Sequence, residues 1–201
     1  MFGNLPENLR PKLELPHETR ATCSACVMAR ADWPRDARDT GPFDAQLKCC
    51  TYHPFIPNFT LAKLINSGLH KSELTEAFGK GRVTPLGLLP PETTTARSED
   101  FGRDLNQRCS FLSRDSKCTI WSDRPSVCRA YFCVSNENET GQAKWKAAEA
   151  KGNELEWTRA HEILWQMGFT QDEIEANSFA EWTGREQQFF LRLFDVAQAT
   201  S

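Results

Sequence analysis

Eight cysteines are the residues of this sequence whose type and spacing carry the clearest chemistry. Thiolate sulfur binds zinc and iron, and four thiolates complete a tetrahedral centre when tight turns bring them together. One C-x2-C knuckle occurs at 23–26, and four cysteines fall within the 25 residues of 109–133. We therefore expect all of the cysteines to be metal ligands, namely Cys23, Cys26, Cys49, Cys50, Cys109, Cys118, Cys128 and Cys133.

The expected cell compartment favours metal ligands over disulfides. Residues 1–20 contain no apolar run of signal-peptide length, and no later window approaches the roughly 18 apolar residues of a membrane span. We therefore expect a cytoplasmic protein with no membrane contact, and reducing conditions in the cytoplasm make structural disulfides uncommon. The net charge of -3 gives no basic surface for nucleic acid, so we do not expect that partner either.

Cys49 and Cys50 are adjacent in the chain, and this limits how they bind metal. Side chains of consecutive residues diverge on a strand, so these two thiols cannot easily share one mononuclear tetrahedron. Either two four-thiolate sites meet at this dipeptide, or the centre is polynuclear, as in an iron-sulfur cluster. Division in chain order would group Cys23 and Cys26 with Cys49 and Cys50. The connecting segments are also long enough for the two sets to interleave.

Basic residues adjoin several cysteines and would offset the negative charge of a metal-thiolate centre. Lys48, Arg108, Lys117 and Arg129 each flank a cysteine. Arg124 and Arg129 are also placed to brace the turn that holds Cys128. These side chains would also lower the pKa values of neighbouring thiols.

Histidine and tryptophan residues are weaker candidates for the metal site. His53 follows Cys50 by three residues, but we expect a hydrogen-bonded imidazole there because eight thiolates already suffice. Trp121 and Trp145 are candidates for apolar shields over a metal centre.

Helical and turn signals flank the cysteines. The sequence predicts helices that begin at Thr60 and Ser72, an exposed connection over 84–100, and a β-hairpin with a cysteine on each arm over 109–118. A short helix is expected after Asp123.

The C-terminal part of the sequence has helical spacing and no cysteine. A long helix is predicted from about Gly141, with a break near Gly152, and Gly168 fits its C-terminal cap. Two further helices are predicted to begin with capping boxes at 170–173 and 183–186.

These signals together predict a mainly α fold with a small β-hairpin and irregular, metal-stabilised cysteine-rich loops. The hydrophobic fraction of 39% is below the globular norm, so a bound metal is expected to support a modest core. We expect a metal-binding domain over 20–135 and a helical segment over 140–201 that packs on it as one unit. Residues 1–20 contain three prolines and predict an extended arm of little function.

The second cysteine group also resembles a known family. Its runs Cys109-Ser-Phe-Leu, Cys118-Thr-Ile-Trp and Arg124-Pro-Ser-Val-Cys128-Arg-Ala-Tyr-Phe-Cys133 are similar to the signature of the CxxCxxCC family of YkgJ-like zinc- or iron-chelating domains. The resemblance covers roughly residues 20–135. It implies metal chelation by eight cysteines, in a mostly prokaryotic, bacterial group. The chain departs from the family pattern in its first half, where 22 residues separate Cys26 from Cys49.

Two functions are consistent with these features. The first is a zinc- or iron-binding protein in which the metal holds the fold together and the remaining surface binds a protein partner. The second is an iron-sulfur protein that transfers electrons or serves as an accessory subunit of a modifying enzyme. The sequence has no nucleotide-binding glycine loop, nucleophile elbow or metalloprotease helix motif, which argues against an enzyme acting alone.

Overall fold

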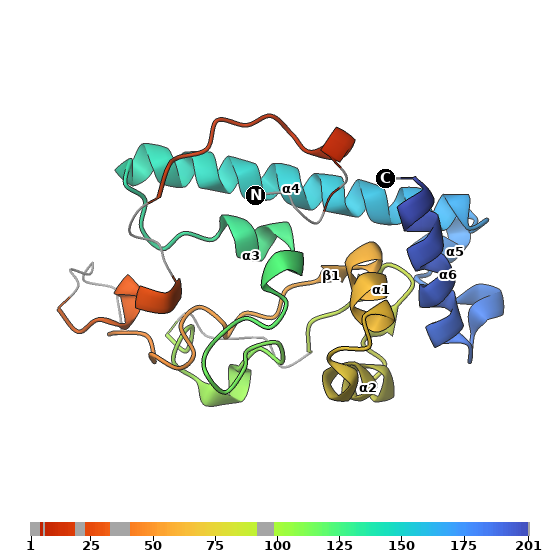
Figure 1. The fold of residues 1–201 in the computed structure, drawn as a ribbon, viewed down its shortest axis with the longest axis horizontal. Coiled ribbons are helices and arrows are strands. Elements are labelled where there is room, and N and C mark those ends of the chain that lie inside the picture. Colours follow the sequence, from red (N-terminus) through yellow and green to blue (C-terminus); the bar gives the residue numbers. More distant parts are fainter. Residues whose placement is uncertain (1–4, 6, 19–22, 33–40, 92–98, 201) are drawn as a thin grey trace.

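A computed structural model describes residues 5, 7–18, 23–32, 41–91 and 99–200 of this chain (Figure 1). Its α-helices are α1 (Asn58–Asn66), α2 (Lys71–Gly79), α3 (Ser126–Ala130), α4 (Asn138–Gln166), α5 (Gln171–Glu175) and α6 (Glu186–Ala199). Short 3-10 turns occur at Glu7–Leu9, Cys23–Ala25, Val27–Ala29, Leu105–Gln107, Trp121–Asp123 and Ala180–Trp182. Strands β1 (Ile56–Pro57), β2 (Val83–Thr84) and β3 (Gly87–Leu88) form an antiparallel sheet in the order β1-β3-β2.

The predicted fold class, mainly α with a small β component, is confirmed, but the sheet lies elsewhere in the chain. Over 109–118 the structure has one antiparallel bridge, between Leu112 and Cys118, which closes a tight loop. The sheet instead uses residues from the connection predicted over 84–100, and Leu86 and Leu88 within it are buried. The prediction of an exposed connection was therefore wrong over 84–88, while residues 92–98 lie outside the described part of the chain.

Gly87, on the central strand β3, allows this strand to lie unusually close to β1. Its φ is +145°, and a Cβ atom there would lie 2.0 Å from the carbonyl oxygen of Ile56 on β1. The backbones of β1 and β3 can approach this closely only because residue 87 has no side chain. The start of α1 also lies against the sheet, because the N–H of Asn58 donates to the carbonyl oxygen of Leu86 at 2.9 Å.

The Gly87→Ala variant is expected to lower the free energy of unfolding by at least about 1–3 kcal/mol through backbone strain, with the clash against Ile56 adding to this. Urea unfolding measures the change. Gly79→Ala is the matched control, because Gly79 ends α2 in open space and alanine is the better helix former there. Equal stability of Gly87→Ala and wild type would contradict the described sheet.

Helices α1, α4 and α6 form the main core. Leu61 of α1, Ile163 of α4 and Phe189 of α6 are completely buried and belong to one apolar cluster. Asn58 begins α1 and is also completely buried, and its amide donates to the carbonyl oxygens of Pro85 and Ala160, at 3.0 Å each. One side chain therefore ties α1 to both the sheet turn and α4.

Helix α4 is the longest element and runs without a break over 29 residues, as Figure 1 shows. The break predicted near Gly152 was wrong, because Gly152 lies on the buried face and packing along the helix outweighs the low helix propensity of glycine. The predicted end is confirmed, with Gly168 at φ +91° just after the cap. Among the described helices, none combines the length and apolarity that a membrane crossing requires.

The helix starts were predicted with mixed success. The capping box of Thr170 and Glu173 is confirmed at α5. The second predicted box was wrong, since Glu186 accepts from the backbone N–H of Gly184 at 2.7 Å and Thr183 donates to Ala180 at the preceding 3-10 turn. Helices α1 and α2 begin at residues 58 and 71, slightly before the predicted starts.

The N-terminal arm lies along α4, as Figure 1 shows. Leu5 is buried in the core, and the carboxylate of Glu18 accepts hydrogen bonds from Ser135 Oγ at 2.6 Å and Trp145 Nε1 at 2.7 Å. Burial raises the pKa of Glu18, but these bonds outweigh it and hold the pKa below its usual value. The arm therefore packs on the molecule at both described ends.

Candidate metal centre

The cysteines predicted as metal ligands come from separate segments on the side of the molecule away from α5 and α6 (Figure 1). All eight are free thiols. Cys23 is exposed and the other seven are partly buried. The structure thus leaves every one of these sulfur atoms available for ligation.

Cys109 and Cys118 lie on the two sides of a closed loop. The backbone N–H and the hydroxyl of Thr119 both donate to the carbonyl oxygen of Phe111 at 2.9 Å, which holds the two sides together. Each cysteine sulfur also accepts a backbone N–H from the residue two positions later, Phe111 for Cys109 and Ile120 for Cys118. Phe111 and Ile120 are buried, so the core fixes both donors.

Four of the thiols, which we call the Cys50 group, act on one another's pKa values: Cys50, Cys109, Cys118 and Cys128. The backbone N–H of Cys109 donates to the carbonyl oxygen of Cys50 at 2.8 Å, which joins two distant segments. Burial, followed by the charges of Cys109, Cys118 and Cys50, raises the pKa of Cys128. Burial also raises the pKa of Cys109 to about 12, and Cys50 and Cys118 add to this.

The other four thiols form a second set, the Cys49 group: Cys23, Cys26, Cys49 and Cys133. Burial and then the charges of Cys26 and Cys23 raise the pKa of Cys133 to about 12. Cys49 also interacts with Cys133 and Cys23. The two groups overlap at Cys23, because Cys50 raises its pKa more than Cys26 does, and Cys23 in turn raises the pKa of Cys118.

Aromatic rings connect the segments of the Cys49 group. The N–H of Phe43 donates to the carbonyl oxygen of Met28 at 2.8 Å, which places the 23–29 segment beside Phe43. The ring of Phe101 lies 5.4 Å from that of Phe43 and 5.8 Å from that of Tyr131, both in edge contacts. Partial burial and then the thiolates of Cys133, Cys49 and Cys26 raise the pKa of Tyr131. Sequence reasoning missed this role of Tyr131, although the residue stands within the family-like run.

Lys48 controls the direction of the cysteine dipeptide. It adopts φ +55°, a conformation uncommon for residues other than glycine, in a turn over 45–51. The dipeptide therefore lies in a turn and not on the strand that we assumed. Its two thiols are each other's main partners, and Cys133 and Cys23 act on Cys49 more weakly. A hydrogen bond from the Cys49 thiol favours ionisation of Cys50 and lowers its pKa.

Two cations face the thiols most directly. Arg124 lowers the pKa values of thiols in both groups, and Lys48 does so for Cys23 and Cys50. The guanidinium of Arg124 stacks 3.5 Å from the ring centroid of Trp121 and donates to the carbonyl oxygens of Trp121 and Cys128. Arg129 donates to the carbonyl oxygens of Ser122 and Arg124, so it braces the turn as predicted.

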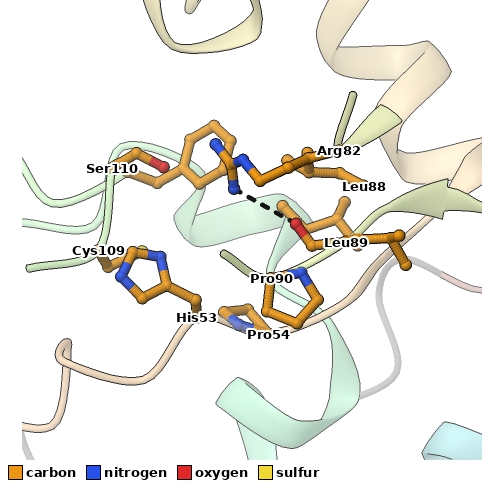
Figure 2. Close-up of a pocket in the computed structure, with 10 residues that line it drawn as sticks. His53, Pro54, Arg82, Leu88, Leu89, Pro90, Cys109 and Ser110 are labelled. Carbon is orange, nitrogen blue, oxygen red and sulfur yellow. Dashed lines mark hydrogen bonds between the residues drawn. The ribbon is translucent and has the colours of Figure 1, made fainter. Parts of the chain in front are cut away.

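His53 lies beside Cys109 in a small pocket with room for about one water molecule (Figure 2). The Nε2 atom of His53 forms a hydrogen bond with the carbonyl oxygen of Gln107 at 3.0 Å, as expected for a hydrogen-bonded imidazole. Burial lowers the pKa of His53. Figure 2 shows the guanidinium of Arg82 between Leu89 and Ser110 on the other side of this pocket, where Arg82 donates to Leu89 at 3.3 Å.

The two tryptophans predicted as shields differ in position. Trp145 is buried and stacks on Phe132, with the two ring centroids 4.0 Å apart. Phe132 directly precedes Cys133 in the chain. Trp121 is 51% exposed and instead supports Arg124 through ring stacking. Trp145 therefore packs behind the Cys49 group, while Trp121 positions a cation.

The donor set has the chemistry that zinc or iron requires. Within the described residues, no three histidine, cysteine, aspartate or glutamate side chains already converge as a finished ligand sphere. Eight free thiols nevertheless exceed the four ligands that one tetrahedral thiolate centre needs. Backbone N–H donors and cations accompany them, as metal-thiolate sites need. The residues therefore fit a thiolate-bound metal.

Helix α4 contacts the start of α3, which is the helix that carries Cys128. The buried carboxylate of Glu156 accepts from both the backbone N–H and the hydroxyl of Ser126, at 2.8 Å each, at the start of α3. A carboxylate at this position satisfies an N–H group that has no partner within the helix. Glu156 thereby fixes the orientation of α3 relative to α4.

The Glu156→Ala variant is expected to lower the free energy of unfolding by about 1–3 kcal/mol, because two buried donors lose their acceptor. Metal affinity should fall about 10-fold as α3 loosens around Cys128. Urea unfolding and a competitive zinc titration measure these effects. Glu154→Ala is the matched control, since Glu154 on the same helix makes only an exposed ion pair with Lys151. Identical results for both variants would contradict the positioning role.

The sequence of this chain matches the model of a known protein family. The model of the CxxCxxCC family, described as "Putative zinc- or iron-chelating domain", matches residues 47–149, which is about half of the chain. This chain belongs to the CxxCxxCC family. The CxxCxxCC match begins at the turn before Lys48 and ends inside α4, so it starts and ends later than the 20–135 range expected from the sequence.

The CxxCxxCC match includes the Cys50 group entirely, with Cys49 and Cys133, and leaves Cys23 and Cys26 outside. Its last residue is Glu149 on α4. No curated protein and no solved structure gave a significant match to the chain.

Proposed function

We propose that this CxxCxxCC chain binds zinc or iron through its eight cysteine thiols. The observation that carries the proposal is that distant cysteine segments meet, because the N–H of Cys109 donates to the carbonyl oxygen of Cys50, 59 residues earlier in the chain, at 2.8 Å. Collecting free, partly buried thiols costs free energy when they ionise, because their charges repel each other. A bound cation removes this cost by neutralising the thiolates.

Each protein group has a role in holding the metal. The Cys50 group and the Cys49 group supply the ligands. The backbone N–H groups of Phe111 and Ile120 orient two of the sulfur atoms, and Arg124 and Lys48 offset the excess negative charge. Zinc or iron would supply crosslinks between segments that are largely irregular. A protein partner for the remaining surface and a cytoplasmic location belong to the same proposal.

An iron-sulfur cluster is the alternative within this proposal. The adjacent Cys49 and Cys50 favour it, since a cluster with several irons accepts ligands that diverge. The N–H bonds to the sulfur atoms of Cys109 and Cys118 are also consistent with it, because such bonds tune cluster potentials. This alternative would make the protein an electron carrier or an accessory subunit of a modifying enzyme. Visible absorption of protein purified without air distinguishes the two, since zinc-thiolate protein is colourless.

Single substitutions test the ligand assignment. Cys128→Ser and Cys133→Ser are each expected to lower the metal content and the melting temperature together, because each removes one of the proposed ligands. Elemental analysis and thermal unfolding measure both quantities. Ser110→Ala is the matched control, because Ser110 is exposed and next to Cys109 without a thiol. Full metal content and an unchanged melting temperature in both cysteine variants would refute the assignment.

A further inference from the structure

We propose that Glu18 is a positioning residue that holds the N-terminal knuckle, Cys23 and Cys26, at the metal centre. This inference rests on the proposed metal-binding function and gives a role to a residue that is not a ligand. The knuckle lies outside the family match, which begins at residue 47. Contacts made by the N-terminal segment itself must therefore bring these two cysteines to the others.

The carboxylate of Glu18 accepts hydrogen bonds with both of its oxygen atoms. Its Oε1 accepts from Ser135 Oγ at 2.6 Å and from Trp145 Nε1 at 2.7 Å, and its Oε2 accepts from the backbone N–H of Asn136 at 2.7 Å. The side-chain amide of Asn136 also donates to the carbonyl oxygen of His17 at 3.0 Å. Two consecutive residues of the arm are thus fixed to the segment that leads into α4.

The groups that bind Glu18 are themselves held in place. Ser135 is buried, and a Cβ atom at Gly141 of α4 would overlap its hydroxyl oxygen, so the missing side chain at residue 141 leaves room for Ser135. Trp145 is buried and stacks on Phe132. Donors with fixed positions hold a carboxylate in one place, and hydrogen bonds to a charged group are the stronger ones.

These contacts lie between two cysteine segments of the chain. Cys133 precedes Ser135 by two residues, and Cys23 follows Glu18 by five. A fully extended chain covers at most about 7 Å in two residues and about 18 Å in five. One carboxylate therefore keeps the beginning of the knuckle close to the end of the second cysteine group.

The other end of the knuckle has a separate attachment. Met28 follows Cys26 by two residues, and its carbonyl oxygen accepts from the N–H of Phe43 at 2.8 Å. The N–H of Asp44 donates in turn to the carbonyl oxygen of Gly102 at 2.8 Å. Loss of the Glu18 contacts would leave the knuckle attached to the centre by this end alone. Metal binding would then have to order the segment, and ordering a chain costs conformational entropy.

The Glu18→Ala variant tests this role, with zinc as the probe. We expect its zinc affinity to fall about 10- to 100-fold, the range for residues that orient metal ligands. A competitive titration of protein purified without air measures the change. Glu14→Ala is the matched control, because Glu14 is an exposed carboxylate on the same arm, and this variant should bind zinc as wild type does.

Two readouts separate positioning of the knuckle from a general loss of stability. In zinc-loaded Glu18→Ala, alkylation by iodoacetamide should reach Cys23 and Cys26 faster than in wild type, while Cys109 and Cys118 stay protected; peptide mass spectrometry identifies the modified thiols. In a background of Cys23→Ser with Cys26→Ser, Glu18→Ala should cause no further loss of zinc affinity. Equal exposure of all four thiols, or an equal loss of affinity in both backgrounds, would overturn the inference.

The Glu18→Gln variant covers the case in which Glu18→Ala fails to fold. Its amide keeps one acceptor oxygen for Ser135 and Trp145 but presents a donor to the N–H of Asn136, so we expect a smaller loss of affinity with the same pattern of alkylation. Unchanged affinity and unchanged protection of Cys23 and Cys26 in Glu18→Gln would overturn the inference. Wild type that binds no zinc or iron would instead refute the proposed function itself.

Discussion

Removal of the bound metal by a chelator under reducing conditions is expected to lower the apparent free energy of unfolding on the order of 10 kcal/mol, the scale of structural zinc in small domains. The physical reason is the uneven core. Fully buried apolar side chains concentrate in α1, α4 and α6, while the segments that carry the cysteines are largely irregular. Those segments would lose their crosslinks and separate, although the helices keep much of their packing.

Thermal unfolding followed by circular dichroism measures this effect, with and without EDTA. Protein treated with EDTA and then reloaded with zinc is the control, and it should recover the original melting temperature. An unchanged melting temperature in protein proven to be metal-free by elemental analysis would contradict a structural role for the metal.

The Phe189→Ala variant is expected to lower the free energy of unfolding by about 3–5 kcal/mol. Phe189 is completely buried on α6, with its ring 4.9 Å from that of Phe190, 5.2 Å from that of Phe179 and 5.7 Å from that of Phe169. Removal of this ring leaves a cavity at the centre of an aromatic cluster that joins α6 to the rest of the core. Urea unfolding at constant metal content measures the loss.

Leu191→Ala provides the matched control for that prediction. Leu191 is two residues away on the same helix and is 46% exposed, so its truncation should change the stability by no more than about 0.5 kcal/mol. A cost for Phe189→Ala as small as that for Leu191→Ala would contradict the described packing of α6.

The sequence predicted the helices better than the strands, for a physical reason. Helix α4 has an apolar period that is visible in the sequence, and Gly168 and the box of Thr170 and Glu173 mark local boundaries. Each strand is only two residues long, too short for a period of two to be recognised. The sheet depends instead on Gly87, whose close approach to Ile56 is a tertiary contact.

The composition of the candidate site was easier to predict than its arrangement. The cysteines could be identified as candidate ligands by type and count, but their neighbours depend on the turn at Lys48 and on the end of α3 before Cys133. Neither feature has a sequence signal as strong as a capping box. Glu156 was also missed, because a carboxylate on the buried face of a helix has no local motif.

The division of the chain into a metal-binding domain over 20–135 and a helical segment over 140–201 stays a prediction. Apolar side chains from both ranges belong to one cluster, and the family match crosses the proposed boundary into α4. Both observations are consistent with one structural unit.

The metal content of protein purified without air tests the central claim most directly. Elemental analysis together with the thiol count should give stoichiometric zinc or iron, with the eight thiols protected from a thiol reagent until the metal is removed. A brown protein with broad visible absorption would identify the iron-sulfur form. Protein that contains neither metal, and in which all eight thiols are paired in disulfides, would contradict the account.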